Sequence, residues 1–293
     1  MEHLIKTNCP ICGSDAQGEK RTIKDHMITQ EEFNVVKCES CGFVYTNPRP
    51  NEDVIGSYYK SEEYVSHSST KKGLVNRLYN LVRSYTLKKK TKLLGEITTG
   101  KELLDIGSGT GHFVDACKKA GFTIEGLEPD EDARRFCKTE FGIELKPLEV
   151  LNKIPVGSKD LITMWHVLEH VYHLQRDFEK ISHILKDNGR LVIGVPNHES
   201  YDAEVYGNGW AAYDVPRHLY HFRKDDISKL ANQHGMKLEK VVPMKFDSYY
   251  VSMLSEKYKK GSNLKAVLNG FKSNRRAKIQ GYSSQIYILS KTK

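Results

Sequence analysis

Four of the six cysteines form two pairs with the spacing of metal ligands. Cys9 and Cys12 make one Cys-x-x-Cys turn, Cys38 and Cys41 make the other, and a glycine follows each pair. Such turns bring thiolates together around a tetrahedral Zn²⁺, with Zn–S distances of about 2.3 Å. Because four thiolates leave no open coordination position, the pattern predicts a structural zinc ion rather than a catalytic one. Disulfides are the alternative, and a cytoplasmic setting disfavours them.

The residues between and after the two pairs alternate between apolar and polar types, as half-buried strands do. We therefore predict a zinc ribbon over residues 1–47. A segment this short has too little core to fold by itself, so metal binding would supply the missing stability. On this interpretation, removing the metal would loosen residues 1–47 and leave the rest of the chain folded.

A second chemical feature is a glycine-rich turn that follows a short apolar strand. Asp105 lies near the end of the strand, Gly107, Gly109 and Gly111 form the turn, and a helical pattern begins at His112. Strand, glycine turn and helix let a cofactor approach backbone N–H groups closely. A carboxylate beside the turn suits a cofactor with an amino group better than a pyrophosphate, which a carboxylate would repel.

An acidic residue follows the next predicted strand, about 20 positions after the turn. This strand covers residues 122–127, and Glu128 and Pro129 come directly after it. In nucleotide-binding α/β domains an acidic residue at this place holds the ribose hydroxyls, because a carboxylate accepts hydrogen bonds from both of them. The glycine turn and Glu128 together predict a nucleoside-containing cofactor.

The remaining elements must hold these residues at one edge of a sheet. Strand patterns at 160–164, 191–197, 236–242 and 284–289 alternate with helical ones, which predicts a doubly wound, Rossmann-like α/β domain with a seven-stranded sheet. We place this domain at residues 96–293 and a helical linker or lid at 48–95. Two insertions are expected: one at about 197–223 that covers the substrate, and a basic one at about 255–280.

The segments LLDIGSGTGHF, GLEPD, DLITMWHVLEHV and LVIGVPN resemble the ordered motifs of class I S-adenosylmethionine-dependent methyltransferases, in particular the ubiquinone-biosynthesis O-methyltransferase branch. Together with the ribbon, WHVLEHV and PRHLYHF resemble bacterial polysaccharide or nucleotide-sugar methyltransferases. The resemblance implies that S-adenosylmethionine is the cofactor. It assigns Asp105 and the three glycines to the methionyl and ribose region, Glu128 to the ribose, and Pro129 to the adenine edge. His166 would flank the methionyl group, and Leu148 is the expected adenine contact.

A hydroxyl acceptor needs a proton acceptor, and histidine is the natural base near neutral pH. His170 lies four residues after His166, so both lie on one face if the segment is helical. His218 and His221 come from an aromatic-rich segment of the first insertion and are further candidates for the base. In the same segment, Arg217 could bind a substrate phosphate or carboxylate through its planar fork, beside Tyr213. No metal-binding spacing marks these histidines, so we assign them no metal.

The net charge of +8 and the pI of about 9.0 favour an anionic partner. Basic residues gather at 88–92 and 257–278. The first interpretation is O-methylation of a small anionic acceptor such as a sugar or nucleotide sugar, although C-methylation of a sugar would look similar. The alternative is an RNA methyltransferase that binds RNA through the ribbon and these basic clusters. A binding protein without activity is disfavoured by the intact motifs. The sequence lacks a membrane-spanning run, and we expect a cytoplasmic protein.

Overall fold

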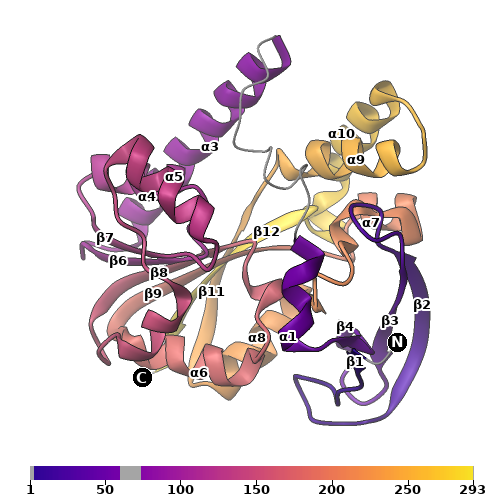
Figure 1. The fold of residues 1–293 in the computed structure, drawn as a ribbon, viewed down its shortest axis with the longest axis horizontal. Helices are drawn as coiled ribbons and strands as arrows, with labels where there is room; N and C mark the ends of the chain where they lie inside the picture. The colour runs from indigo at the N-terminus through magenta and orange to yellow at the C-terminus, as the bar shows by residue number, and fades with distance from the viewer. Residues whose placement is uncertain (1–2, 60–73, 293) are drawn as a thin grey trace.

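The computed structural model describes residues 3–59 and 74–292 (Figure 1). Residues 60–73, which belong to the predicted lid, lie outside the described part. The N-terminal strands are β1 (Leu4–Ile5), β2 (Gln17–Lys24), β3 (Glu32–Cys38), β4 (Val44–Thr46) and β5 (Arg49–Pro50). β2, β3 and β4 form an antiparallel sheet, and β1 pairs with β5 beside it. The ribbon strands thus continue to residue 50, slightly beyond the predicted end at 47.

The second domain is built on a central sheet with the order β11-β12-β9-β8-β6-β7. Its strands are β6 (Glu102–Ile106), β7 (Thr123–Leu127), β8 (Lys159–Trp165), β9 (Leu185–Pro196), β11 (Met236–Pro243) and β12 (Ser284–Lys291). β12 runs antiparallel to both of its neighbours, whereas β7, β6, β8 and β9 are mutually parallel. The described sheet has six strands where seven were expected. Next to β7, at the edge, only a single bridge joins Leu127 to Lys146.

Helices cover both faces of this sheet, as the predicted fold class requires (Figure 1). They are α1 (Glu52–Ile55), α3 (Leu74–Ile97), α4 (His112–Lys119), α5 (Glu131–Phe141), α6 (Leu174–Ile184), α7 (Tyr201–Tyr206), α8 (Lys224–Gln233), α9 (Asp247–Tyr258) and α10 (Asn263–Gln280). Short 3₁₀ turns connect several of them, including η2 (Leu148–Lys153) and η3 (Leu168–His170). None of the helices in the described ranges is long and apolar enough to cross a membrane.

Neighbouring residues of the central strands point to opposite faces, so each strand supplies two cores. Leu103 and Leu161 pack with Phe113 of α4 on one face. Leu104 and Ile162 pack on the other face, in a cluster that reaches α6 and α8. The inner strands β6 and β8 are buried on both sides, which explains their continuous apolar runs in the sequence.

The two predicted insertions have definite places in the fold. The first contains α7 and a short strand, β10 (Tyr220–His221), which pairs with β4 and becomes the fourth strand of the ribbon sheet. The second contains the last turn of α9 and all of α10, and these two helices pack against each other and against α7. The ribbon and the first insertion therefore form one structural unit.

Candidate functional site

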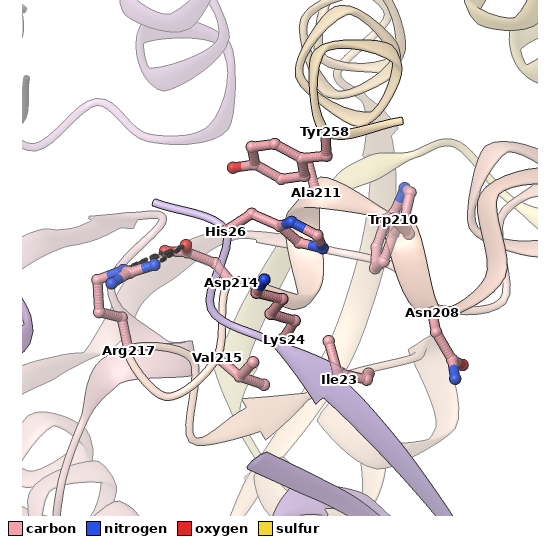
Figure 2. A pocket seen from close by; sticks show the side chains of 10 residues that line it. All are labelled: Ile23, Lys24, His26, Asn208, Trp210, Ala211, Asp214, Val215, Arg217 and Tyr258. Atoms are coloured by element: carbon pink, nitrogen blue, oxygen red, sulfur yellow. Dashed lines mark hydrogen bonds and ion pairs between the residues drawn. The ribbon is translucent and has the colours of Figure 1, made fainter. Parts of the chain in front are cut away.

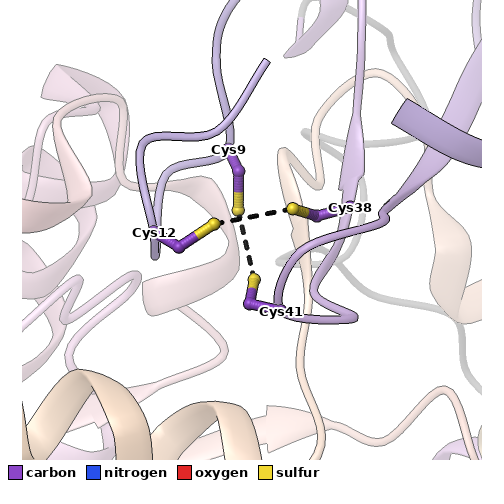
Figure 3. A group of neighbouring side chains, drawn as sticks. All are labelled: Cys9, Cys12, Cys38 and Cys41. Atoms are coloured by element: carbon purple, nitrogen blue, oxygen red, sulfur yellow. Dashed lines mark hydrogen bonds between the residues drawn. The ribbon is translucent and has the colours of Figure 1, made fainter. Parts of the chain in front are cut away.

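The four paired cysteines come together at one end of the ribbon (Figure 3). One sulfur from each residue lies within 4.8 Å of the others. The Sγ atoms of Cys9 and Cys41 are 3.5 Å apart, as are those of Cys12 and Cys38. Four sulfurs at about 2.3 Å from a tetrahedral Zn²⁺ lie about 3.8 Å from one another, so the cluster fits the predicted structural zinc ion.

The zinc ribbon is not an independent module. Ile11, Phe43 and Tyr45 of the ribbon belong to the same buried cluster as Leu174 and Phe178 of α6. Side chains of the second domain also donate hydrogen bonds to ribbon carbonyls: Gln175 to Pro10 at 2.8 Å, Gln233 to Ile11 at 2.7 Å and Lys229 to Cys41 at 2.8 Å. The four-cysteine site therefore lies against the face of the second domain that α6 and α8 cover.

The glycine turn lies at the carboxyl end of β6, and it is open on the side of Gly109. The Gly109 N–H donates to Oε2 of Glu128 at 2.7 Å, and a side chain at Gly109 would meet nothing within 4 Å. A Cβ on Gly107 would come within 2.3 Å of Val167, and one on Gly111 would come too close to Cys137. All three glycines have positive φ. Two of them therefore allow close packing below the turn, while Gly109 leaves open the side where a cofactor would lie.

Asp105 is buried at the end of β6 and accepts a hydrogen bond of 2.6 Å from the Thr163 hydroxyl. Burial raises the pKa of Asp105 to about 6, although Lys90 of α3 opposes the shift. The Lys90 ammonium lies 3.9 Å from the centre of the Trp165 ring, and burial lowers its pKa to about 8. A buried carboxylate is poised to pair with a cofactor ammonium group.

Glu128 holds the other side of the same turn. Oε1 accepts from the Asp130 N–H at 3.0 Å and Oε2 from Gly109, which fixes the carboxylate while leaving lone pairs for ribose hydroxyls. Burial raises its pKa. Pro129 is exposed beside it, and Leu148 is 38% exposed at the start of η2. The structure therefore gathers Asp105, the glycines and Glu128 at one place, and the adenine contacts expected of Pro129 and Leu148 stay a prediction.

His166 follows β8 and has a φ of 55°, a left-handed conformation that is uncommon for residues other than glycine. Its Nε2 lies 3.0 Å from Asp247, and its Nδ1 lies 3.3 Å from Oε1 of Glu169. Burial would lower the pKa of His166, but the two carboxylates outweigh burial and raise it to about 10. The ring is therefore a cation held between two anions, and not a free base.

Two of the predicted catalytic histidines come together. The rings of His170 and His218 are 4.6 Å apart and perpendicular. Nδ1 of His170 donates to the Arg217 carbonyl at 3.0 Å and also contacts the Tyr59 hydroxyl at 2.9 Å. Burial and the neighbouring His218 lower the pKa of His170 to about 4, so this ring is neutral at physiological pH.

His221 and Tyr213 lie on the ribbon side of the insertion. Both are buried, and their rings are in edge contact at 5.2 Å. Nε2 of His221 lies 3.3 Å from the Thr46 hydroxyl of β4, and the Tyr213 hydroxyl accepts from Arg21 at 3.5 Å. In the structure these residues join the insertion to the ribbon, which differs from the catalytic and substrate-binding roles that the sequence suggested.

Arg217 lies beside the pocket of Figure 2, where its guanidinium pairs with Asp214. It also donates to Asp25 at 2.9 Å and to the carbonyl of Tyr58 at 3.0 Å, and only 1% of the residue is exposed. Burial alone would lower the pKa of Arg217, but the two carboxylates raise it. We expected this arginine to bind a substrate phosphate or carboxylate. In the structure its guanidinium is instead paired with two carboxylates of the protein.

We expect Arg217→Met to lower the free energy of unfolding by about 3–5 kcal/mol, because it leaves the buried carboxylate of Asp25 without its cationic partner. Urea unfolding measures the change. The matched control is Arg176→Met, whose exposed guanidinium pairs with Asp177 at the surface and should contribute less than about 1 kcal/mol. Equal, small changes in the two variants would contradict the structural role of Arg217.

Sequence reasoning missed Glu169 and Lys90. Glu169 has an exposed fraction of 1% and lies between His166 and the pair of His170 and His218. Its spacing of three residues from His166 was the available signal. Lys90 was taken only as part of a basic surface cluster, because nothing in its local sequence indicates that its ammonium lies over the Trp165 ring, close enough to influence Asp105.

Comparison with known proteins places this geometry in a family. A family model described as "Methyltransferase domain" matches residues 79–241, more than half of the chain. The chain is similar to a ubiquinone biosynthesis O-methyltransferase of Nitrosococcus oceani, with 24% identity over 56% of this chain and 73% of that protein. It is also 28% identical to a demethylmenaquinone methyltransferase of Tropheryma whipplei, over 43% of this chain and about half (54%) of that protein.

Solved structures show the same fold. A SAM-dependent methyltransferase from Archaeoglobus fulgidus covers 71% of this chain and 94% of its own length, with a TM-score of 0.50 and 21% identity. A magnesium protoporphyrin IX methyltransferase from Synechocystis, solved with bound SAH, covers 83% of this chain and all of its own length, with a TM-score of 0.54 and 14% identity. At these identities the similarity concerns the fold alone.

Proposed function

This chain belongs to the methyltransferase domain family, and from this premise we propose that it transfers a methyl group from S-adenosylmethionine to a hydroxyl group of a small polar acceptor, such as a sugar or nucleotide sugar. The observation that carries the proposal is the open turn at Gly109 between two fixed carboxylates, Asp105 and Glu128.

The chain's residues fit the two polar ends of this cofactor. Asp105 is a buried acceptor for the methionyl ammonium group, and Glu128 is a fixed acceptor for the ribose hydroxyls. The cofactor supplies a methyl group that is already activated as a sulfonium. The protein's tasks are therefore to align the two reactants, exclude water and provide a path for the acceptor proton.

The acceptor class is argued from the polar cluster after β8. Glu169, His170 and His218 gather within 4.8 Å of one another, where an acceptor hydroxyl could lose its proton. The acceptor oxygen then forms a bond to the methyl carbon while the bond from that carbon to sulfur breaks. A cluster of carboxylate and imidazole groups suits a hydroxylated acceptor better than an apolar one.

The test starts with calorimetric titration of the protein with S-adenosylhomocysteine. The same protein is then incubated with methyl-labelled S-adenosylmethionine and three acceptor sets: nucleotide sugars, quinols and RNA. We expect S-adenosylhomocysteine to bind and the label to appear on an oxygen atom of a nucleotide sugar. Label in quinols or RNA alone would overturn the acceptor class, and label on carbon would overturn O-methylation. Absence of cofactor binding would overturn the proposal as a whole.

A further inference from the structure

A second cavity lies between the ribbon sheet and the second domain, and it shares no lining residue with the pocket of Figure 2. Its volume is about 220 Å³. Residues of β2, β3 and β4 form one wall, and residues 198–199, Tyr213 and Arg223 form the other. The polar cluster after β8 and the glycine turn contribute no residue to this cavity. It is therefore a candidate binding site distinct from the one described above.

Cations outnumber anions among the charged residues of the two walls. The cations are Arg21, Lys37 and Arg223, and the anions are Glu19 and Glu199, which leaves one net positive charge. Glu19 pairs with Arg21 at 2.8 Å, and Glu199 pairs with Arg223 at 3.1 Å. Both carboxylates are exposed, and ion pairs of this kind contribute no more than about 1 kcal/mol. An anionic ligand could therefore replace either carboxylate at little cost.

His198 brings an unpaired polar atom to the same cavity. Its Nε2 is buried and has no hydrogen-bond partner among the described residues. Burial lowers the pKa of His198 to about 4; the carboxylate of Glu199 opposes this change, and the three cations of the cavity add to it. The ring is thus neutral and close to all three cations. A buried polar atom without a partner costs about 1–3 kcal/mol, and a ligand atom bonded to Nε2 would remove this cost.

The ribbon backbone makes room for one of these cations. Gly42 directly follows Cys41 and has a φ of 78°. A Cβ at this position would lie 3.0 Å from Nη2 of Arg223, which is too close for an ordinary contact. On its other side, the guanidinium is held by the fully buried Asp226 at 3.3 Å. Arg223 is therefore fixed in place at the border between the two domains before any ligand binds.

We propose that this cavity is a second ligand site, which binds the phosphate group of a small phosphorylated molecule such as a sugar phosphate. Guanidinium and ammonium groups are the usual side-chain partners of phosphate. A phosphate ester has three free oxygens that point in different directions, so it can contact cations from both walls, whereas a carboxylate has only two oxygens in one plane. The cavity is smaller than the roughly 300–1,000 Å³ of sites for drug-sized ligands, so its ligand is small.

A ligand in this place would join the ribbon to the second domain. Arg21 and Lys37 would bind it from the ribbon, and His198 and Arg223 from the other wall. A ligand that binds only where both walls are assembled stabilises the folded protein by mass action. Binding should therefore raise the melting temperature, which can be measured without knowledge of the methyl acceptor.

The experiment titrates the full-length, zinc-loaded protein with glucose 6-phosphate, inorganic phosphate and glucose, followed by calorimetry and thermal unfolding. We expect one equivalent of glucose 6-phosphate to bind and to raise the melting temperature. Inorganic phosphate should compete with it, and glucose should not bind. Arg21→Gln and Lys37→Glu should each weaken binding of glucose 6-phosphate more than about 10-fold, because each removes a charged hydrogen-bond donor.

His198→Phe tests the other wall. It should also weaken binding about 10-fold, yet leave the melting temperature of the free protein unchanged, because the nitrogen that it removes has no partner in the folded chain. A purely structural role of His198 would instead lower the melting temperature. All three variants should bind S-adenosylhomocysteine as the unaltered protein does, which shows that their defect is confined to the cavity.

The matched control is Lys20→Glu, which makes the same change of charge on β2 but lies outside the cavity. It should bind glucose 6-phosphate normally. The proposal is wrong if the unaltered protein binds neither phosphate compound, if glucose binds equally well, or if binding persists in all three cavity variants. UDP-glucose separates this site from the acceptor site: if Arg21→Gln and Lys37→Glu weaken its binding as well, the cavity belongs to the acceptor site and the claim of a second site fails.

Discussion

Asp105→Asn should weaken the binding of S-adenosylhomocysteine by roughly 3 kcal/mol, or roughly 100-fold, as measured by calorimetry. The amide keeps the shape of the side chain and can still accept from the Thr163 hydroxyl. It removes only the negative charge that would face the methionyl ammonium group. This substitution therefore tests the contribution of the charge to cofactor binding while the shape of the side chain is kept.

The same substitution should not lower the melting temperature. Burial raises the pKa of Asp105 from 3.8 to about 6, so ionisation of this group destabilises the folded state as the pH rises through that interval. Asparagine has no such charge and avoids this loss at neutral pH. Unchanged cofactor affinity in Asp105→Asn would refute the assigned role, and a lower melting temperature would contradict the destabilising effect of the buried charge.

The raised pKa of Asp105 also predicts how cofactor affinity depends on pH. Below about pH 6 the carboxyl is protonated and no longer attracts an ammonium group, so affinity should fall towards that of the asparagine variant. The variant itself should show little change over the same range. A matching decrease in both proteins would assign the pH dependence to another group.

Removal of zinc is the second change for which we expect a large effect. Structural zinc contributes on the order of 10 kcal/mol to the folding of small zinc modules. Because Cys9 and Cys38 lie in the same buried cluster as Phe178 of α6, we expect a strong chelator to lower the melting temperature of the whole chain in one transition. The sequence had suggested that only residues 1–47 would loosen, and the shared core is the reason for the difference.

Differential scanning calorimetry with and without the chelator measures this effect. Added Zn²⁺ should restore the original transition, and added Mg²⁺, which prefers oxygen ligands, should not. Methyl transfer should be lost before cofactor binding, because the Thr46 hydroxyl of β4 donates to the carbonyl of His218 at 2.7 Å. Two separate transitions, with the cofactor domain unaffected, would restore the simpler two-module interpretation.

Features that are local in the sequence could be predicted. The fold class, the cysteine pairs and the turn from Asp105 to Glu128 depend on spacings of a few residues to about 20, which constrain the backbone directly. The doubly wound fold is confirmed by the sheet order and by the similar solved structures. The number of strands was less predictable, because the sequence around Lys146 forms a single bridge at the sheet edge.

Features that depend on distant contacts could not be predicted. Arg217 has the residue type of a phosphate ligand, but Asp25, 192 positions away, pairs with it. His221 has the residue type of a base, but β4 covers it. Glu169 was passed over, since its burial beside His166 appears only when the surrounding elements are in place. In each case the residue type was informative, and the partner that decides its role comes from elsewhere in the chain.

The pairing of β10 with β4 has a consequence for the order in which the chain acquires its structure. Thr46 and His221, which contact each other across this pair, are separated by 175 positions. On the ribosome, domains generally fold as units, with N-terminal ones first. Here β2, β3 and β4 cannot complete their sheet until the chain has been extended by the 175 positions that separate Thr46 from His221, so the four-cysteine site reaches its final form only after most of the second domain has been synthesised.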